Sequence, residues 1–257
     1  MNDIAAPDYT TVQYQSLKGR NVLISGGATG IGADMVTAFA VQGANVAFLD
    51  INDEAGSALA AETGATYKNC DLRDIERVKT IIAELHDTMG AFGAVLNNAA
   101  RDDRHNMFEI DADYWDECLN TNLRHQFFVT QQVAQPMADA GGGSIILFGS
   151  VSWMRGRPGI IAYTTSKAAI NGMTRSLARE LGPMGIRVNS LVPGAVHTER
   201  QIQWTPPEKN EEFLREQALK FRLNAHHIAR MALFLASDES AGCAAANFTV
   251  DAGLGFN

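Results

Sequence analysis

The sequence predicts a single α/β domain, built on a doubly wound, seven-stranded parallel sheet with helices on both faces. Short apolar segments alternate with amphipathic helical patterns along most of the 257 residues, as expected of a sheet whose strands are joined by helices. The early strand candidates are continuous apolar runs, as expected of strands buried on both faces. No internal repeat or break in composition divides the chain, so we expect one domain.

The expected elements follow in chain order. The strand candidates are NVLIS (21–25), NVAFLD (45–50), TYKNC (66–70), AVLN (94–97), SIILFG (144–149), RVNSLV (187–192) and NFTV (247–250). Helical patterns lie near 31–42, 53–62, 74–89, 113–139, 161–181 and 227–236. Residues 1–18 are predicted to form a polar N-terminal arm and residues 19–257 the domain. Residues 198–218, polar and interrupted by two prolines, are predicted to be an insertion or lid after the sixth strand.

Composition narrows the classes of function. A net charge of −8 argues against a general nucleic-acid binder or a binder of anionic membranes. We expect no signal peptide, because the N-terminus has no basic region followed by an apolar one, and no membrane span, because no long apolar run is present. The three cysteines lack paired spacing, so we expect no disulfide framework, no metal site and a cytoplasmic location.

A glycine-rich turn, SGGATGIG, follows the first strand and opens the first helix. Gly26, Gly30 and Gly32 let the backbone approach a phosphate closely, and the helix N-terminus then offers N–H groups to a pyrophosphate. The spacing G-x-x-x-G-x-G differs from the more usual G-x-G-x-x-G fingerprint. The turn therefore predicts a dinucleotide cofactor, and the alternative is an ordinary tight strand–helix turn.

The second strand ends at Asp50, where a carboxylate can accept hydrogen bonds from ribose hydroxyls and repel a 2′-phosphate. Ile51 follows it, and residues 26–32 contain no lysine or arginine. These features favour NAD over NADP. The alternative for Asp50 is a helix N-cap.

A tyrosine and a lysine four residues apart, Tyr163 and Lys167, would share one face of the helix expected over 161–181. A free phenol has a pKa near 10, and a nearby cation favours the phenolate, so Tyr163 is a candidate general base. Ser150, at the end of the fifth strand, is a candidate to hold the substrate oxygen. Alone, the pair could be a chance surface pair and the serine a turn residue.

Five motifs in order, SGGATGIG, LNNAA (96–100), Asn122, Ser150 and YTTSK (163–167), resemble the short-chain dehydrogenase/reductase family over residues 18–253. The resemblance implies a Rossmann-type fold and adds Asn122 as a fourth catalytic residue, which braces a helix and a water-mediated proton relay to Lys167. The implied cofactor-binding residues are Gly26, Thr29, Gly30, Ile31, Gly32, Asp50, Ile51, Asp71, Leu72, Asn98, Ala99, Tyr163, Lys167, Pro193, Gly194, Val196 and Thr198. Ser25 stands in place of the family's usual threonine, and Ala100 in place of a glycine.

Further segments, RDDRH (101–105), YWDE (114–117), NLRH (122–125), FGSVSW (148–153) and RQIQW (200–204), resemble bacterial NAD-dependent aldose 1-dehydrogenases of the D-xylose and L-arabinose type. The substrate-binding candidates are Asp102, His105, Asn106, Ser150, Ser152, Trp153, Tyr163, Gln201 and Trp204. A sugar needs several polar groups and a flat apolar face such as an indole. The charges of the DDRH segment could instead pair with each other or with a neighbouring subunit, and Arg124 and His125 could lie at a subunit face.

The expected reaction is therefore oxidation of the anomeric C1 hydroxyl of a cyclic aldose, a pentose or hexose, to the aldonolactone, with hydride transfer to NAD. The alternatives are an NAD-linked dehydrogenase of a polyol, hydroxy acid or other secondary alcohol, and a non-catalytic NAD-binding regulator. The expected partners are the sugar and, by family resemblance, three further copies of the chain in a homotetramer, with no nucleic acid or membrane.

Overall fold

The computed structural model describes residues 7–204 and 206–255, without the side chains of residues 203, 204, 207 and 209. The strands are β1 (Asn21–Ser25), β2 (Asn45–Asp50), β3 (Thr66–Asn69), β4 (Ala94–Asn97), β5 (Gly143–Phe148), β6 (Ile186–Pro193) and β7 (Asn247–Val250). They form a seven-stranded sheet in the order β3-β2-β1-β4-β5-β6-β7, with every neighbouring pair parallel. The doubly wound α/β fold that the sequence predicts is confirmed.

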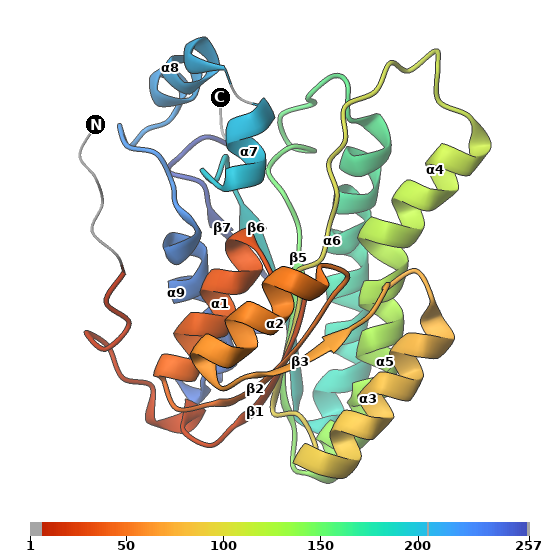
Figure 1. The fold of residues 1–257 in the computed structure, drawn as a ribbon, viewed down its shortest axis with the longest axis vertical. Coiled ribbons are helices and arrows are strands. Elements are labelled where there is room, and N and C mark those ends of the chain that lie inside the picture. Colours follow the sequence, from red (N-terminus) through yellow and green to blue (C-terminus); the bar gives the residue numbers. More distant parts are fainter. Residues whose placement is uncertain (1–6, 205, 256–257) are drawn as a thin grey trace.

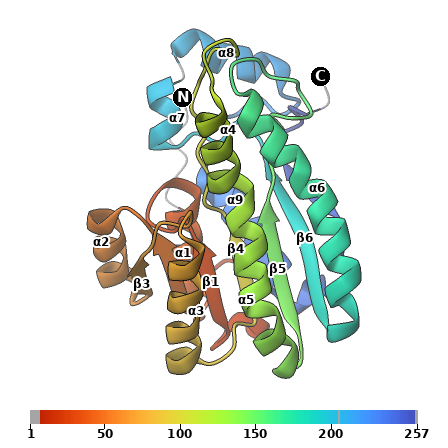
Figure 2. The same ribbon diagram turned by 90° about the vertical axis from the view of Figure 1, so that its right-hand side faces the viewer.

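Helices cover both faces of the sheet (Figures 1 and 2). One face carries α1 (Gly30–Val41), α2 (Asp53–Thr63) and α9 (Ala225–Ala236), and the other carries α3 (Ile75–Met89), α5 (His125–Asp139) and α6 (Ile161–Leu181). Each face therefore has its own apolar core. The central strands are apolar on both sides because both sides are buried, as in β1, where Val22, Leu23 and Ile24 are at most 1% exposed.

The helix expected over 113–139 is interrupted. The structure has α4 (Ala112–Leu119), a π turn (Asn120–Arg124) and then α5. The side-chain amide of Asn122 donates to the carbonyl of Cys118, at 2.9 Å. A side chain that bonds the carbonyl four residues earlier competes with the regular helical ladder. Such π turns are frequent at functional sites.

The described part of the N-terminal arm packs against α1 and α9. The Tyr9 ring is 4% exposed, and its hydroxyl donates to Asp34 on α1, at 2.6 Å. The Gln42 amide donates to the main-chain oxygens of Tyr9 and Val12, and the Arg230 guanidinium of α9 lies over the Tyr9 ring. The arm is thus held on the domain by a buried aromatic ring as well as by polar contacts.

The strand order reverses between β1 and β4, which are neighbours in the sheet although β2 and β3 lie between them in the chain. The crevice outside the carboxyl ends of such a pair is the usual ligand site of open α/β sheets. Two short helices, α7 (Glu199–Trp204) and α8 (Pro207–Glu216), lie beyond this end of the sheet (Figure 1). Within the described residues, no helix is both long and apolar enough to cross a membrane.

Candidate active site

The glycine-rich turn is tightly constrained. Gly26 and Gly30 have φ values of +67° and +56°, a region that favours glycine. A Cβ on Gly32 would lie 1.8 Å from the carbonyl oxygen of Gly26, so no side chain fits there. Thr29, the N-cap of α1, makes no side-chain capping bond, and the first turn of α1 contains no acidic residue. These N–H groups fit a pyrophosphate, which an uncapped helix N-terminus binds well.

Asp50 lies at the end of β2, as expected. Its two carboxylate oxygens accept the main-chain N–H groups of Ala28, at 2.9 Å, and Asn52, at 3.0 Å. The N-cap of α2 is Asn52 rather than Asp50, since the Asn52 side chain accepts from the main-chain N–H of Ala55. Each Asp50 oxygen keeps a further lone pair for a ribose hydroxyl. Ile51 is 68% exposed beside it.

Asp71, one of the cofactor-binding candidates, is paired with a neighbouring side chain. Its carboxylate is bound by the guanidinium of Arg73, with contacts of 3.0 and 2.6 Å. The Arg73 guanidinium holds the pKa of Asp71 below its usual range and also pairs with Glu117 of α4. An adenine ring would therefore compete with Arg73 for this side chain. Leu72, next in the chain, is buried.

The other predicted cofactor residues surround the glycine-rich turn. Asn98 donates to the main-chain oxygen of Gly26, at 2.8 Å. The Ala99 N–H donates to the hydroxyl of Ser25, at 3.3 Å, so the hydroxyl that Ser25 retains at the position of the family's usual threonine is used. Thr198 lies next to Gly30, 3.5 Å from where a Cβ on that glycine would be. Of the remaining members, Ile31 lies on α1, Pro193 ends β6, and Gly194 and Val196 follow that strand.

Helix α6 presents Tyr163 and Lys167 on one face, with the Lys167 ammonium 5.7 Å from the centre of the Tyr163 ring. Lys167 is 1% exposed and donates to the main-chain oxygen of Phe148, at 2.8 Å. Burial lowers the pKa of Lys167 to about 7. Burial and then the charge of Asp102 raise the pKa of Tyr163 to about 12, against the opposing effect of a hydrogen bond with Ser150. The protein groups alone thus favour the neutral phenol, whereas we expected Lys167 to favour the phenolate.

Ser150 is 8% exposed, just beyond β5. Its hydroxyl lies 2.8 Å from that of Ser152 and accepts the Ser152 main-chain N–H at 3.2 Å. The Ser150 hydroxyl also hydrogen-bonds the phenol of Tyr163. This arrangement can hold an alcohol oxygen between the serine and the tyrosine.

Asn122 is fully buried in the π turn, and its side-chain oxygen accepts the Arg101 N–H at 2.7 Å. Gln126, one turn later, donates to the Asn122 carbonyl at 3.0 Å and accepts the Phe148 N–H at 3.2 Å. Since Lys167 binds the Phe148 carbonyl, Gln126 links Asn122 to the strand end that holds the lysine. We did not predict Gln126 from the sequence, although its position four residues after Asn122 was a usable signal.

His125 does not lie at a subunit face, so that alternative was wrong for this residue. Its side chain is fully buried, and among the described residues its ring nitrogens make no well-formed hydrogen bond, only a weak backbone contact with Thr121. Burial, and secondarily the charge of Lys167, lower the pKa of His125 to about 3. Arg124 is exposed, with its guanidinium over the ring of Phe128.

Asp102 is the centre of a charged cluster at the edge of the site. Arg200 of α7 approaches it at 3.3 Å, Arg104 at 3.6 Å, and the Gln201 amide donates to it at 3.1 Å. Arg200 also pairs with Asp103. The charges of the DDRH segment therefore pair with each other and with α7 within one chain. Asp102 and Gln201, both substrate-binding candidates, are brought together, while Arg200 was missing from our prediction.

The remaining substrate-binding candidates have different surroundings. Both ring nitrogens of His105 are bonded to protein groups, Tyr114 and the main-chain N–H of Ile161. Asn106 is exposed, and its side chain bonds Glu109 and the Phe108 N–H within its own turn. Trp153 is partly buried, and its indole N–H is buried without a partner in the described part of the chain. The Trp204 side chain lies outside the described residues.

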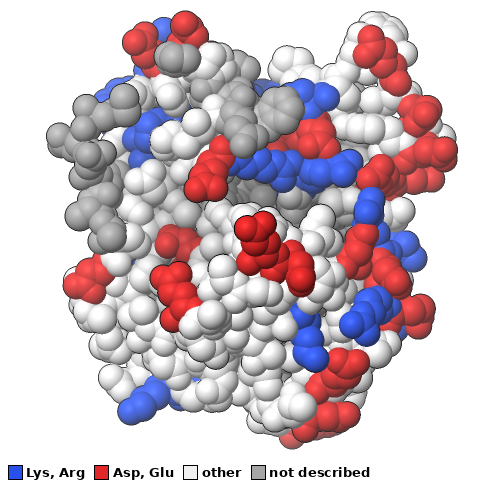
Figure 3. All heavy atoms as spheres, viewed as in Figure 1, with Lys and Arg blue, Asp and Glu red and all other residues white. Residues whose placement is uncertain are grey.

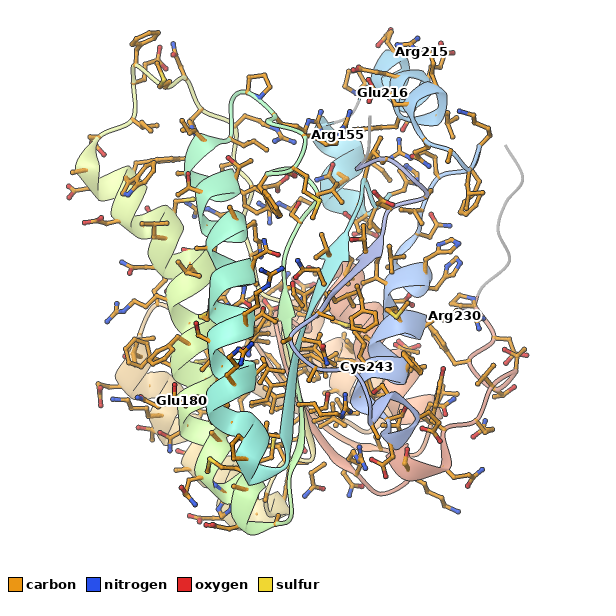
Figure 4. The ribbon with its side chains drawn as sticks, turned by 180° about the vertical axis from the view of Figure 1, so that it is seen from behind. Arg155, Glu180, Arg215, Glu216, Arg230 and Cys243 are labelled. Carbon is orange, nitrogen blue, oxygen red and sulfur yellow. The ribbon has the colours of Figure 1, made fainter. Side chains whose placement is uncertain are left out.

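The segment predicted as a lid is attached to the loop after β5. Figure 4 shows Arg155 of that loop beside Glu216 at the end of α8, and the two side chains form an ion pair. Two further guanidinium groups, of Arg157 and Arg222, lie over the ring of Phe213 of α8. Acidic and basic side chains are interspersed across the upper part of the face in Figure 3.

Within the described residues, no three His, Cys, Asp or Glu side chains are grouped to hold a metal ion, and the three cysteines are free.

Comparison with known proteins gives three kinds of match. The family model described as enoyl-(acyl carrier protein) reductase matches residues 26–255. The chain is 47% identical to the D-xylose 1-dehydrogenase of Caulobacter vibrioides, over 93% of this chain and 97% of that one. It is 44% identical to a probable galactose dehydrogenase of Rhizobium meliloti, over 94% and 97%. Among solved structures, a 3-oxoacyl-[acyl-carrier protein] reductase from Brucella melitensis superimposes with a TM-score of 0.90 at 29% identity, covering 100% and 99% of the two chains.

Proposed function

The chain belongs to the short-chain dehydrogenase/reductase family of oxidoreductases, which use nicotinamide cofactors, and we propose that it is an NAD-dependent aldose 1-dehydrogenase. The proposed reaction oxidises the anomeric C1 hydroxyl of a cyclic pentose or hexose to the aldonolactone. The observation that carries the proposal is the near-full-length similarity to a D-xylose 1-dehydrogenase and a probable galactose dehydrogenase. The chemistry of the side chains around Ser150 and Asp102 supports it.

That chemistry suits a polyhydroxylated ring. The Ser150 and Ser152 hydroxyls, the Asp102 carboxylate and the Gln201 amide provide donors and acceptors at the same end of the sheet. Trp153 adds an aromatic ring together with an indole N–H that has no partner within the described part of the chain. Sugars are bound by this combination of hydrogen-bonding groups and a flat apolar surface.

Two features support NAD over NADP. Asp50 places a carboxylate where the adenosine ribose of a bound dinucleotide would lie, and it would repel a 2′-phosphate. The adjacent side chain is the exposed and uncharged Ile51. The test is the double variant Asp50→Ala with Ile51→Arg, which is expected to raise NADP use relative to NAD. Unchanged cofactor preference would contradict the assignment.

In the proposed mechanism, Tyr163 is the general base and Ser150 holds the substrate oxygen. Bound NAD would accept the hydride from C1 and add positive charge near the phenol. The Lys167 ammonium lies 5.7 Å from the centre of the Tyr163 ring and is held there by the Phe148 carbonyl. When Lys167 is protonated, its positive charge stabilises the phenolate of Tyr163. Asn122 and Gln126 fix the strand end and the π turn around the lysine. The alcohol proton passes to the phenolate oxygen of Tyr163 as the carbonyl of the lactone forms.

The function is tested by NADH formation with a panel of sugars and alcohols. Activity with L-arabinose, D-xylose, D-galactose or L-fucose is expected. Activity only with open-chain polyols, hydroxy acids or other secondary alcohols would contradict the aldose proposal and show that the protein is an NAD-linked dehydrogenase of those alcohols. No activity with any of them, despite NAD binding, would favour a non-catalytic regulator.

A further inference from the structure

Helix α6, which carries Tyr163 and Lys167, begins without a cap of its own. Its N-cap residue is Ile160, a buried aliphatic side chain that makes no capping bond. The main-chain N–H of Thr164 already bonds the Ile160 carbonyl, but the N–H groups before it have no acceptor within the helix. The first of them, Ile161, needs an acceptor from elsewhere in the chain.

His105 supplies that acceptor from the loop between β4 and α4. The Ile161 N–H donates to Nε2 of His105, at 3.0 Å. The His105 main-chain N–H donates to the Gly159 carbonyl, at 2.9 Å. The loop is thus bonded to the beginning of α6 on both sides of Ile160.

The bond to Ile161 also fixes the tautomer of His105. Because Nε2 accepts, the proton of the neutral imidazole must be on Nδ1. Nδ1 lies 2.9 Å from the Tyr114 hydroxyl and donates to it, and that hydroxyl in turn donates to the Asp103 carbonyl at 3.4 Å. Tyr114 belongs to α4, which leads directly into the π turn of Asn122.

We propose that His105 is a positioning residue, which caps the catalytic helix α6 and couples it through Tyr114 to α4, instead of binding the substrate. Both ring nitrogens are used by protein groups, so the neutral side chain has no free nitrogen for a sugar hydroxyl. The capped N–H is two residues before Tyr163, within the same helical turn. The cap therefore limits fraying of the turn that carries the proposed base. This inference rests on the proposed role of Tyr163.

The decisive experiment compares two amides at position 105. His105→Gln places a carbonyl oxygen at the reach of Nε2 and keeps the cap, whereas His105→Asn reaches only as far as Nδ1 and loses it. With NAD and whichever substrate the wild type oxidises, His105→Asn should lower kcat by at least about twofold and at most about 30-fold, the factor that corresponds to the largest usual loss of helix stability on removing an N-cap. His105→Gln should recover most of that loss, and the KM for the substrate should change little in either variant.

A substrate-binding role gives a different pattern. In that case both variants would raise the KM for the substrate, and the glutamine would not rescue kcat selectively. That outcome would overturn the proposal, as would wild-type kcat in His105→Asn. Tyr163→Phe in the same assay tests the proposed function separately, because an active Tyr163→Phe enzyme contradicts the role of the base whatever His105 does.

A measurement independent of turnover keeps the inference testable if a variant is inactive. Amide hydrogen exchange, followed by mass spectrometry of a peptide covering residues 159–164, reports on the Ile161 N–H. Exchange there should be roughly 2- to 30-fold faster in His105→Asn than in His105→Gln or the wild type. Equal exchange in all three folded proteins would show that His105 does not cap α6.

Discussion

The fully buried His125 gives a prediction whose size follows from the structure. Burial without a well-formed hydrogen bond among the described residues lowers its pKa from an ordinary 6.5 to about 3. The unfolded chain therefore binds a proton at this imidazole as the pH falls through 6.5, while the folded chain does not until about pH 3. Stability attributable to His125 is present above pH 6.5 and is lost progressively as the pH falls toward 3.

The loss of folding stability through His125 can be calculated for the interval from pH 8 to pH 5. Each pH unit below the unfolded pKa costs about 1.4 kcal/mol, so between pH 8 and pH 5 the folded state loses about 2 kcal/mol through His125. His125→Leu removes the titrating group and keeps an apolar side chain in the core. The free energy of unfolding of this variant, relative to the wild type, should therefore be about 2 kcal/mol more favourable at pH 5 than at pH 8.

Urea unfolding at the two pH values, followed by circular dichroism, measures this difference. His86→Leu, on the solvent-facing part of α3, is the matched control for loss of an imidazole. A His125→Leu effect of equal size at pH 5 and pH 8 would refute the reasoning, because it would show that the imidazole titrates alike in the folded and unfolded chains.

Three further predictions concern activity. Because burial raises the pKa of Tyr163 to about 12 and lowers that of Lys167 to about 7, kcat/KM should rise by up to about tenfold per pH unit below about pH 7 and level off above it, where Lys167 loses the charge that stabilises the phenolate. A profile that is flat below about pH 7 would contradict this. Gly32→Ala would add a Cβ 1.8 Å from the Gly26 carbonyl oxygen. It should weaken NADH binding, measured by fluorescence titration, about tenfold or more. Unchanged affinity in a folded variant would show that cofactor binding does not depend on the tight packing of this turn. Arg200→Ala removes an ion pair to Asp102 and should raise the KM for the substrate by up to about fivefold. A change in kcat alone would show that this ion pair does not contribute to substrate binding.

The sheet could be predicted from the sequence because burial on both faces makes the central strands recognisable apolar runs. The strand from Asn45 to Asp50 is an example, with its acid at the carboxyl end where the chain leaves the core. Tyr163 and Lys167 could be placed together because helical spacing alone puts them on one face. These features depend on residues close in sequence.

The parts that escaped prediction depend on particular side-chain contacts, some local and some between distant segments, that the order of residue types does not reveal. The apolar pattern of α4 and α5 continues across Asn122, so the π turn cannot be recognised without the bond from its side chain to Cys118. Asp71, a cofactor-binding candidate, is bound by the guanidinium of Arg73 two residues later. His105 was expected to bind substrate because of its neighbours in sequence, yet its partners are 9 and 56 residues away.

The central claim, oxidation of an aldose at C1 with Tyr163 as the base, is tested most directly by one comparison. Initial rates of NADH formation are measured for the wild type and Tyr163→Phe with D-xylose, L-arabinose and D-galactose. We expect activity with at least one of these sugars and a loss of roughly a hundredfold or more in kcat for Tyr163→Phe, with NAD binding retained. A wild type inactive on every aldose, or a variant that keeps its turnover, would contradict the account.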